Sequence, residues 1–573
     1  MSRIVFILMC VLQHLTAGEA TVTTTPATTE QRAAILALLQ ARAPGLHLEL
    51  VIDPTLAAES FRVEDNAHGW RIVGGDTRGL LYGGGSLVRR RAAGMYPVGS
   101  GTPAKSVRGV YLATHFGNWF QAAPVAEVET YVDDLALRGA NSIAVWFDLH
   151  QYRGWTDPAV APMITRLRAI LGRARSLGLE TTLTGLANEA WADSPPELRA
   201  TWSSGHDGYT ADPMGHYHLE LCPSKPAGRK LLLQWRGEVL EAFAKPGIDR
   251  LLGIDRLLIW PYDQGGCTCA ACAPWGAKGF LDLAEATADL YHHATPTGKA
   301  TISTWYFGRF HPGEWPAFRQ ALAKSPARWI HDLLVDDIAT ADPGHPLTAG
   351  APAGLRLIGF PEVTMWGNDW RIPWGGFGAA PYPTHLRKLW HEHGAKLDGG
   401  FIYTEGLFAD LNTSLLLRQW WDGNEAPTGV DDELAAEFGP VAAPLLSDAV
   451  SMMELSFGRD RRTVDGAAPP EPDQPTDAAR LRFVIREPGA AQLVEALLAK
   501  AEELVSPAIR QGWRWRCLRL RARIDAALIT SGGAVDGSVD RLLSELTTIY
   551  HAQTAGWAVA PPTQAALTRP GAL

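Results

Sequence analysis

The sequence lacks several features that would place it in a specialised class of protein. It has no surplus of positive charge, because 52 Lys and Arg residues face 61 Asp and Glu, a formal net charge of −9 over 573 residues. A nucleic-acid interface needs clustered basic side chains, so we expect no nucleic-acid partner. Charged residues make up 20% and apolar residues 46%, which excludes disordered, collagen-like and coiled-coil classes.

Long apolar runs are scarce, and the most prominent one is at the start of the chain. Arg3 precedes an apolar run at 4–12, and Gly18 and Ala20 supply small residues at positions −3 and −1 of a cleavage site. This is the pattern of a secretory signal peptide over residues 1–20. A membrane anchor would need about 20 apolar residues. We therefore expect a soluble exported protein, secreted or periplasmic, without membrane contact.

Cysteine is also rare, and Cys10 falls within the predicted signal peptide. The mature chain keeps five cysteines: Cys222, Cys267, Cys269, Cys272 and Cys517. An odd number leaves at least one free thiol or a metal ligand. The tight run Cys267-x-Cys269-x-x-Cys272, with Cys222 as a fourth ligand, could hold a structural zinc ion. The alternative is a disulfide among these four with the spare thiols buried, and neither alternative is catalytic.

Three regions follow from the periodicity of the apolar residues. Residues 21–105 predict a small α/β domain, with helices at 31–41 and 77–91, strands at 47–52, 61–63 and 70–73, and Asp76 as the N-cap of the second helix. Gly83, Gly84 and Gly85 lie within that helix, so no phosphate loop is expected. Residues 422–573 predict a helical domain, with Asp431 capping a helix to 437, helical pattern to about 456, a linker at 465–476, and helices at 490–504, 513–529 and 539–555.

Residues 106–421 have a different pattern, in which apolar strand-like runs alternate with helical segments. The eight runs are 107–113, 142–147, 181–186, 257–260, 300–306, 329–335, 355–360 and 400–403. Helical spacing fills 125–137 and 161–176. Eight such units predict a (β/α)8 TIM barrel of the α/β class. The sixth run, 329–335, is equally compatible with a helix.

Tryptophan is the residue in excess. The chain has 21, and 17 of them fall between Trp119 and Trp421. Catalytic groups in this fold follow the strand ends, where tryptophans and carboxylates alternate in this sequence. Aromatic faces pack on sugar rings, and a pair of carboxyl groups cleaves glycosidic bonds. About half of the tryptophans are expected to be ordinary core residues.

The strand ends therefore supply candidate site residues. The predicted catalytic residues are Asp263, Glu405 and Glu362. The predicted substrate-binding residues are His115, Trp146, Asp148, His150, Glu189, Trp260, Tyr262, Trp305, Asp337 and Trp366. Asp263 precedes two glycines, which let the backbone approach a ligand closely. Rim carboxylates often only pair with arginine or cap helices, and a buried histidine in a purely structural role is an equal alternative for His115 and His150. A metal triad built from these two histidines lacks tight ligand spacing.

Several segments resemble known enzymes. Residues 70–83 resemble the small domain that precedes the barrel in family-20 β-N-acetylhexosaminidases and family-67 α-glucuronidases, and 108–111 resemble their first barrel strand. Residues 221–226 are similar to a segment of hexosaminidase-like barrels, and 360–362, 373–378 and 405–406 resemble bacterial members of the same broad clan. The resemblance covers roughly residues 60–440, and it implies the barrel fold and glycoside hydrolysis.

One position departs from the family pattern. Family-20 enzymes carry an Asp-Glu pair after the fourth strand, whereas the matching place here reads Asp263-Gln264. A glutamine cannot be the acid, so the acid lies elsewhere or the substrate has no acetamido group. The resemblance to family 67 implies instead that Asp263 acts with Glu362 and Glu405.

These observations lead to a functional hypothesis with two rivals. We expect an exported, exo-acting glycoside hydrolase that removes a terminal hexosaminide- or uronide-like sugar from an oligosaccharide or glycoconjugate, with no cofactor for catalysis. A catalytically inactive barrel that binds a glycan is the first alternative, suggested by Gln264. A polysaccharide lyase or metal-dependent enzyme is the second, suggested by the cysteines.

Overall fold

The structure is a computed structural model of the chain. It describes residues 26–115, 118–201, 219–244, 253–262, 265–308, 313–325, 327–336, 342–361, 363, 379–423, 429–456, 488–531 and 536–551. The predicted signal peptide at 1–20 and the predicted linker at 465–476 lie outside these residues.

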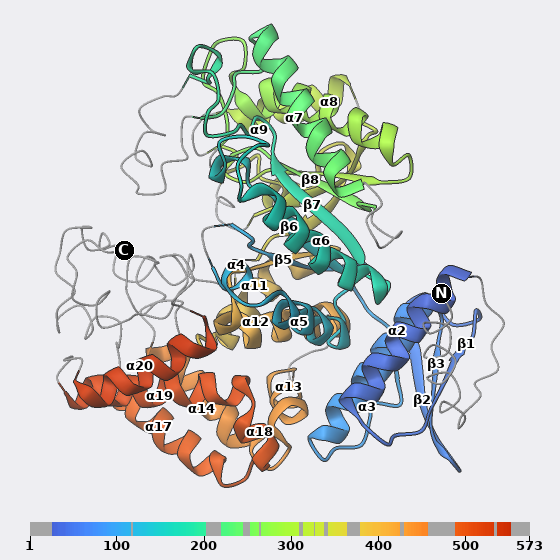
Figure 1. The fold of residues 1–573 in the computed structure, drawn as a ribbon, viewed down its shortest axis with the longest axis vertical. Helices are drawn as coiled ribbons and strands as arrows, with labels where there is room; N and C mark the ends of the chain where they lie inside the picture. Colours follow the sequence, from blue (N-terminus) through green and yellow to red (C-terminus); the bar gives the residue numbers. More distant parts are fainter. Residues whose placement is uncertain are drawn as a thin grey trace, which may run out of the picture.

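Eight parallel strands close into a barrel in the order β10-β11-β12-β5-β6-β7-β8-β9 (Figure 1). The strands are β5 (Val107–Leu112), β6 (Ser142–Trp146), β7 (Glu180–Leu186), β8 (Arg256–Trp260), β9 (Lys299–Ser303), β10 (Ile330–Val335), β11 (Arg356–Gly359) and β12 (Gly399–Thr404). The predicted TIM barrel is confirmed. The ambiguous sixth run is a strand, because β10 pairs in parallel with both β9 and β11.

Helices surround the barrel and connect its strands. They are α4 (Trp119–Ala122), α5 (Val125–Leu137), α6 (Val160–Ser176), α7 (Pro226–Ala244), α8 (Gly279–Ala294), α9 (Glu314–Lys324), α10 (Pro346–Ala349), α11 (Pro383–His393) and α12 (Asp410–Asp422). The strands between them are buried on both faces, which explains why they read as continuous apolar runs.

The barrel closes where β12 pairs with β5, in register from Gly399 opposite Val107 to Thr404 opposite Leu112. Gly399 has φ +95°, and a Cβ atom there would lie 1.7 Å from the carbonyl oxygen of Val107. A Cβ on Gly400 would lie 2.0 Å from the carbonyl oxygen of Gly359 on β11. Closure at this seam therefore requires glycine, because backbone atoms occupy the space of a side chain.

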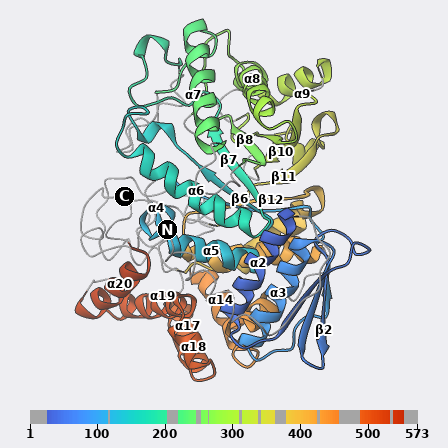
Figure 2. The same ribbon diagram turned by 45° about the vertical axis from the view of Figure 1, so that its right-hand side comes forward.

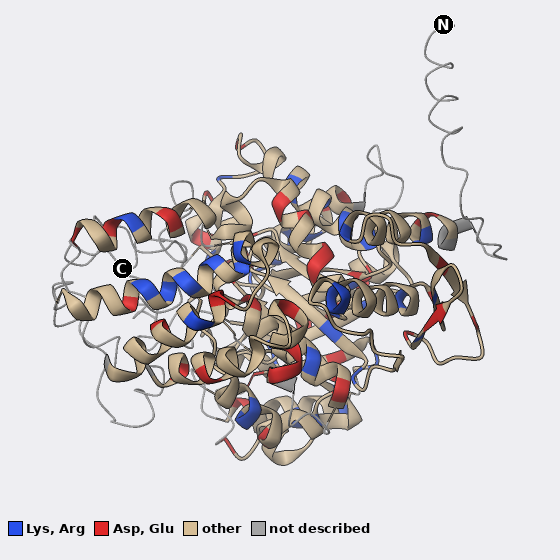
Figure 3. Cartoon of the chain, turned by 90° about the horizontal axis from the view of Figure 1, so that it is seen from below, with Lys and Arg blue, Asp and Glu red and all other residues tan. Residues whose placement is uncertain are grey.

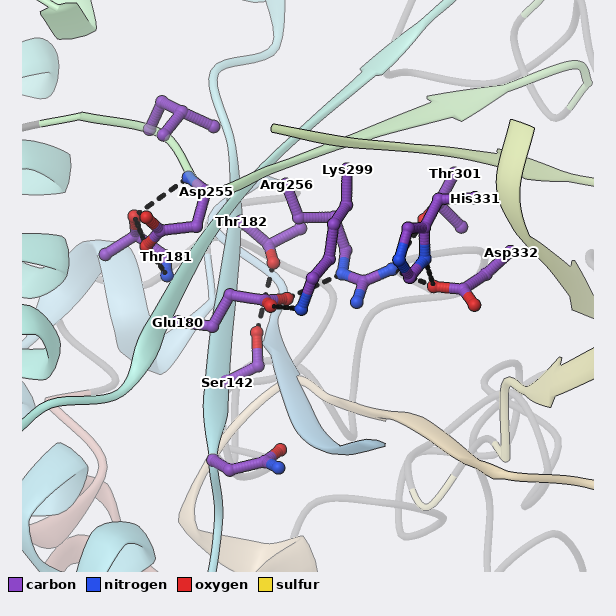
Figure 4. Close-up of polar contacts among 12 residues, drawn as sticks. Ser142, Glu180, Thr181, Thr182, Asp255, Arg256, Lys299, Thr301, His331 and Asp332 are labelled. Carbon is purple, nitrogen blue, oxygen red and sulfur yellow. Dashed lines mark hydrogen bonds and ion pairs between the residues drawn. The ribbon is translucent and has the colours of Figure 1, made fainter. Parts of the chain in front are cut away.

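Charged side chains fill the barrel interior at the amino ends of the strands (Figure 4). Arg256 is 1% exposed and donates to Glu180 Oε1 at 2.6 Å, to Thr301 Oγ1 at 2.7 Å and to Asp332. Its guanidinium lies 5.8 Å from the ring of Phe401. These partners come from β7, β9, β10 and β12, so one arginine joins strands from opposite sides of the barrel.

The N-terminal region is a four-stranded sheet with two helices. Its elements are α2 (Pro26–Arg42), β1 (Leu48–Ile52), β2 (Phe61–Asn66), β3 (Gly69–Gly74), α3 (Thr77–Ala92) and β4 (Ser100–Gly101), with strand order β1-β3-β2-β4. The predicted cap is confirmed, because the Asp76 carboxylate accepts from Gly79 N at 2.8 Å. Figure 2 shows α2 and α3 lying between this sheet and the barrel.

A buried arginine attaches this domain to the barrel. Arg108 of β5 donates to Glu59, and its guanidinium lies 5.3 Å from the ring of Tyr82 and 5.2 Å from that of Trp421. Arg78 pairs with the other oxygen of Glu59 at 2.8 Å. A carboxylate from the domain before the barrel thus balances the buried charge of Arg108.

The C-terminal region is helical, as predicted. It contains α13 (Gly429–Phe438), α14 (Ala443–Ser456), α17 (Pro488–Glu502), α18 (Pro507–Gln511), α19 (Trp513–Thr530) and α20 (Gly537–Ile549). Asp431 lies in the first turn of α13, not at its N-cap, which corrects the prediction. The last helix ends at Ile549, with Tyr550 as its C-cap and His551 at φ +53°, short of the expected 555.

The C-terminal helices attach to the barrel through a second buried charge cluster. Arg138 donates to Asp410 at 2.8 Å and to Glu437 at 2.7 Å, and Arg514 of α19 donates to Asp410 at 2.8 Å and to Asp134 at 2.7 Å. Burial alone would raise the pKa of Asp410, but the two arginines hold it below its usual range.

Charges of both signs are interspersed over the rest of the helices (Figure 3). None of the helices in the described part of the chain has the length and hydropathy that a membrane span requires.

The interior ion network gives a first prediction. Burial alone would raise the pKa of Asp332, but hydrogen bonds from His331 and Arg356 and the charge of Arg256 hold it well below its usual range. Asp332→Asn should lower the free energy of unfolding by about 3–5 kcal/mol at pH 7, because Arg256 loses a buried partner. The lowered pKa makes this stabilisation complete above about pH 4 and lost as the pH falls. Thermal unfolding of both proteins from pH 7 to pH 3 should show a shrinking difference in stability between the wild type and Asp332→Asn. A difference that stays constant with pH would contradict this role.

Candidate active site

Aromatic rings gather at the carboxyl ends of the barrel strands. Trp260 lies 5.8 Å from Trp305 and 4.7 Å from Phe360, measured between ring centroids, and Phe360 lies 5.5 Å from Tyr403. Tyr111 contacts Tyr403 at 5.4 Å and closes the group. We call these five residues the aromatic floor. Each retains 3–7% exposure at the mouth of the barrel, where a ligand of this fold binds.

Two predicted site residues lie beside the floor on adjoining strands. Glu405 follows β12, is fully buried, and accepts from the hydroxyl of Tyr403 at 2.7 Å through Oε1. His115 follows β5, and its Nε2 lies 3.2 Å from the hydroxyl of Tyr111. The His115 ring lies 4.6 Å from Trp146 and 6.2 Å from Tyr403. Because β12 pairs with β5, Glu405 and His115 share one edge of the mouth.

Glu189, after β7, is fully buried among donors. Its Oε1 accepts from Trp146 Nε1 at 3.0 Å and from Leu149 N at 2.8 Å, and its Oε2 accepts from Arg236 at 3.1 Å. Burial raises the pKa of Glu189 to about 7, an effect that Arg236 opposes and the charge of Asp148 reinforces. Glu189 therefore fixes the indole of Trp146 at the mouth and can hold a proton near neutral pH.

A buried histidine lies between two carboxylates next to Glu189. His150 Nδ1 lies 3.1 Å from Asp148 Oδ1, and its Nε2 lies 3.5 Å from Glu220 Oε1. Burial alone would lower the pKa of His150, but these two carboxylates raise it to about 10. The two carboxylates thus favour the protonated ring. Ligand atoms of Asp148, His150 and Glu189 also lie within 4.8 Å of one another.

Sequence reasoning missed Glu220. It lies in a segment without periodicity, just before the hexosaminidase-like stretch at 221–226, so the only signal was its position beside that stretch. The backbone of this segment is held by Asn188, whose Nδ2 donates to Leu221 O at 3.1 Å and to Gly266 O at 2.7 Å.

Tyr262, another predicted site residue, lies against a buried carboxyl group. Its hydroxyl donates to Glu314 Oε1 at 2.6 Å, and both side chains are buried. Glu314 also accepts from Gly276 N at 2.6 Å and from Gly308 N at 2.9 Å, and burial raises its pKa to about 7 despite these bonds. Tyr262 and Glu314 therefore join the loops next to β8, and the contact of Tyr262 with substrate stays a prediction.

Four predicted residues, Asp263, Asp337, Glu362 and Trp366, lie outside the described residues. The residues flanking Glu362 are described. Tyr403 N donates to Pro361 O at 3.0 Å, and Val363 N donates to Tyr403 O at 3.2 Å.

The four clustered cysteines lie together behind the mouth. Cys222 precedes α7, and Cys267, Cys269 and Cys272 lie between β8 and α8. All four are free thiols in the structure, and the choice between a disulfide and a metal ion stays a prediction. Cys517 is buried on α19, apart from the cluster.

Comparison with solved structures shows the same fold in carbohydrate-active enzymes. A family-89 glycoside hydrolase from Clostridium perfringens, in complex with 2-acetamido-1,2-dideoxynojirimycin, superposes with a TM-score of 0.56 at 12% identity, covering 93% of this chain and 68% of that one. A family-138 glycoside hydrolase targeting pectin rhamnogalacturonan II gives 0.53 at 10% identity, covering 95% and 75%. A family-20 β-N-acetylglucosaminidase gives 0.50 at 14% identity, covering 74% and 92%. No protein-family model and no curated protein sequence matches the chain.

These likenesses establish the architecture. The expectation of a family-20-like barrel with an added N-terminal domain and C-terminal helices is confirmed at the level of fold.

The raised pKa of Glu189 gives a second prediction. The folded protein holds a proton on this carboxyl between about pH 4.5 and 7 that the unfolded chain has lost, so the wild type should lose stability as the pH rises through this window. In Glu189→Gln the group no longer titrates. As the pH rises from about 4.5 to 7, the difference in unfolding free energy between Glu189→Gln and the wild type should therefore shift by about 3 kcal/mol in favour of the variant. Parallel curves for the two proteins would contradict the shift.

Proposed function

We propose that the protein is a glycoside hydrolase that removes a terminal sugar from an oligosaccharide or glycoconjugate. The observation that carries the proposal is the aromatic floor with the buried carboxyl group of Glu405 at its edge. Aromatic rings offer apolar faces to a pyranose, and a carboxyl group beside them is what glycosidic cleavage requires. The compared enzymes with the same fold are glycoside hydrolases, which supports the same reaction class.

The mechanism we propose uses two carboxyl groups. Glu405 is one, and Asp263 or Glu362 is the other. One group protonates the leaving oxygen, while the other attacks the anomeric carbon or activates a water molecule there. Tyr403 supports Glu405 by donating to its Oε1. The backbone bonds of Pro361 and Val363 to Tyr403 favour Glu362 as the partner, because they bring the chain on both sides of it next to Glu405.

The low exposure of the aromatic floor suggests a small terminal group as ligand. Its five residues are 3–7% exposed. Trp146, Trp260 and Trp305 supply the stacking faces, and His115 lies where a sugar hydroxyl could be bound. These features favour exo action on a hexosaminide- or uronide-like sugar.

Amide substitutions of the carboxyl groups test this proposal. Glu405→Gln, Asp263→Asn and Glu362→Gln should be assayed on a panel of nitrophenyl glycosides and cell-wall oligosaccharides. Loss of either member of the true pair should lower kcat by about 10²–10⁴ or more, with little change in the melting temperature. Asp398→Asn is the matched control, because it lies just before the opposite end of β12, and it should keep full activity.

The outcomes separate the alternatives. Full activity in Glu405→Gln would remove this residue from the mechanism. Saccharide binding by calorimetry without any released sugar would favour the glycan-binding alternative instead. For an active enzyme, proton NMR of the first product would give the anomer and separate retention from inversion.

Export is the second part of the proposal. The basic residue, apolar run and small residues at 18 and 20 favour cleavage after Ala20. N-terminal sequencing of the protein from its native host should begin at Thr21, in a secreted or periplasmic fraction. A chain that keeps Met1 or stays with the cytoplasmic fraction would contradict this prediction.

A further inference from the structure

Four cysteine sulfurs converge from two separate segments of the chain. Cys222 Sγ lies 3.6 Å from Cys267 Sγ, 3.8 Å from Cys269 Sγ and 3.8 Å from Cys272 Sγ. One ligand atom from each of the four lies within 4.8 Å of every other. Cys222 comes from the segment before α7, and the other three come from the loop that follows β8.

These separations match a tetrahedron of sulfurs around a metal ion. Four sulfurs at about 2.3 Å from one zinc ion lie about 3.8 Å from each other. Sulfurs joined in a disulfide are about 2.05 Å apart, and unrelated buried thiols have no reason to meet as a group of four. We propose that Cys222, Cys267, Cys269 and Cys272 bind one zinc ion as thiolates. The spacing Cys-x-Cys-x-x-Cys supplies three ligands from one loop.

Hydrogen-bond donors surround the sulfurs, as a site of four thiolates requires. The backbone amides of Cys269 and Thr201 point to Cys267 Sγ, and that of Cys272 points to Cys269 Sγ. Ser224 Oγ lies 3.0 Å from Cys222 Sγ and 3.4 Å from Cys269 Sγ. Donors of this kind stabilise the negative charge that four thiolates keep around a divalent ion.

The site is structural because all four positions of a tetrahedron are taken by protein ligands, which leaves none for water or substrate. Its effect is to join two loops that border the mouth of the barrel. Glu220, which faces His150, is two residues before Cys222. Gly266, just before Cys267, donates to Asn188 Oδ1 at 2.9 Å. The zinc ion would therefore fix the backbone of the segment that carries Glu220.

Metal analysis of the full-length protein tests the proposal directly. Inductively coupled plasma mass spectrometry should find about one zinc ion per chain in the wild type. Cys269→Ser should lose most of this zinc, because the substitution removes one of the four ligands. Cys269 is chosen because it is the ligand most open to solvent. Cys517→Ser is the matched control, because it removes a buried cysteine outside the cluster, and its zinc content should equal that of the wild type.

A second measurement covers the case in which Cys269→Ser does not fold. Titration of the native wild-type protein with a mercurial reagent should release zinc, detected by a chromogenic chelator, in proportion to the thiols that react. Hydrogen exchange should then quicken at 219–222 and 265–272, which a thiol outside the site would not affect. This readout does not depend on any enzymatic activity, so it can fail or succeed independently of the proposed hydrolase function.

Three results would overturn the proposal. The first is a protein that contains no zinc as purified and takes up none when the reduced chain is offered the metal. The second is a disulfide between any two of the four cysteines in peptide mass spectra of the native protein. The third is iron, recognised by thiolate-to-iron absorption, at one ion per chain in place of zinc.

Discussion

The barrel depends on the way one cation is neutralised inside it. Arg256 enters the interior from the first position of β8 and meets carboxylates from β7 and β10. A charge at that depth is tolerated only with close partners, so the strands that supply Glu180 and Asp332 have to lie where they do. The apolar faces of the strands would permit several registers, whereas this set of contacts fits one. The interior charge thus specifies an arrangement that hydrophobic burial only favours.

The two ends of the barrel have opposite characters. The amino end is filled by ionic pairs, and the carboxyl end is covered by rings whose polar partners lie at the edge. Glu189 accepts a hydrogen bond from Trp146, and His150 lies nearby between Asp148 and Glu220. These contacts within the protein keep the surroundings of Trp146 fixed. Glu405 accepts a hydrogen bond from Tyr403, one of the aromatic rings. The contact of Glu405 with a residue of the aromatic floor is why it is placed in the proposed chemistry.

Most of the fold was predictable from the sequence, and the reasons are physical. Parallel strands buried on both faces read as apolar runs, and each of the eight runs became a strand. The partner of Tyr262 was not predictable, because alternation gives no direction for a side chain beyond Pro261. Glu220 and Glu314 were missed because they lie in or next to irregular segments, where only the folded chain shows what a carboxylate faces. The cysteine spacing suggested a common site, but only the distances between the sulfurs could favour a metal site with four thiolates over a disulfide.

The contact between Arg108 and Glu59 has a consequence for what counts as a domain in this protein. The polypeptide changes topology near residue 105, yet the guanidinium of Arg108 is 0% exposed and its carboxylate partner belongs to the preceding sheet region. A barrel cut free at that point would keep a desolvated cation without its counter-charge. The boundary is therefore one of architecture and not of autonomy, and the N-terminal sheet and the barrel should melt together as one cooperative unit.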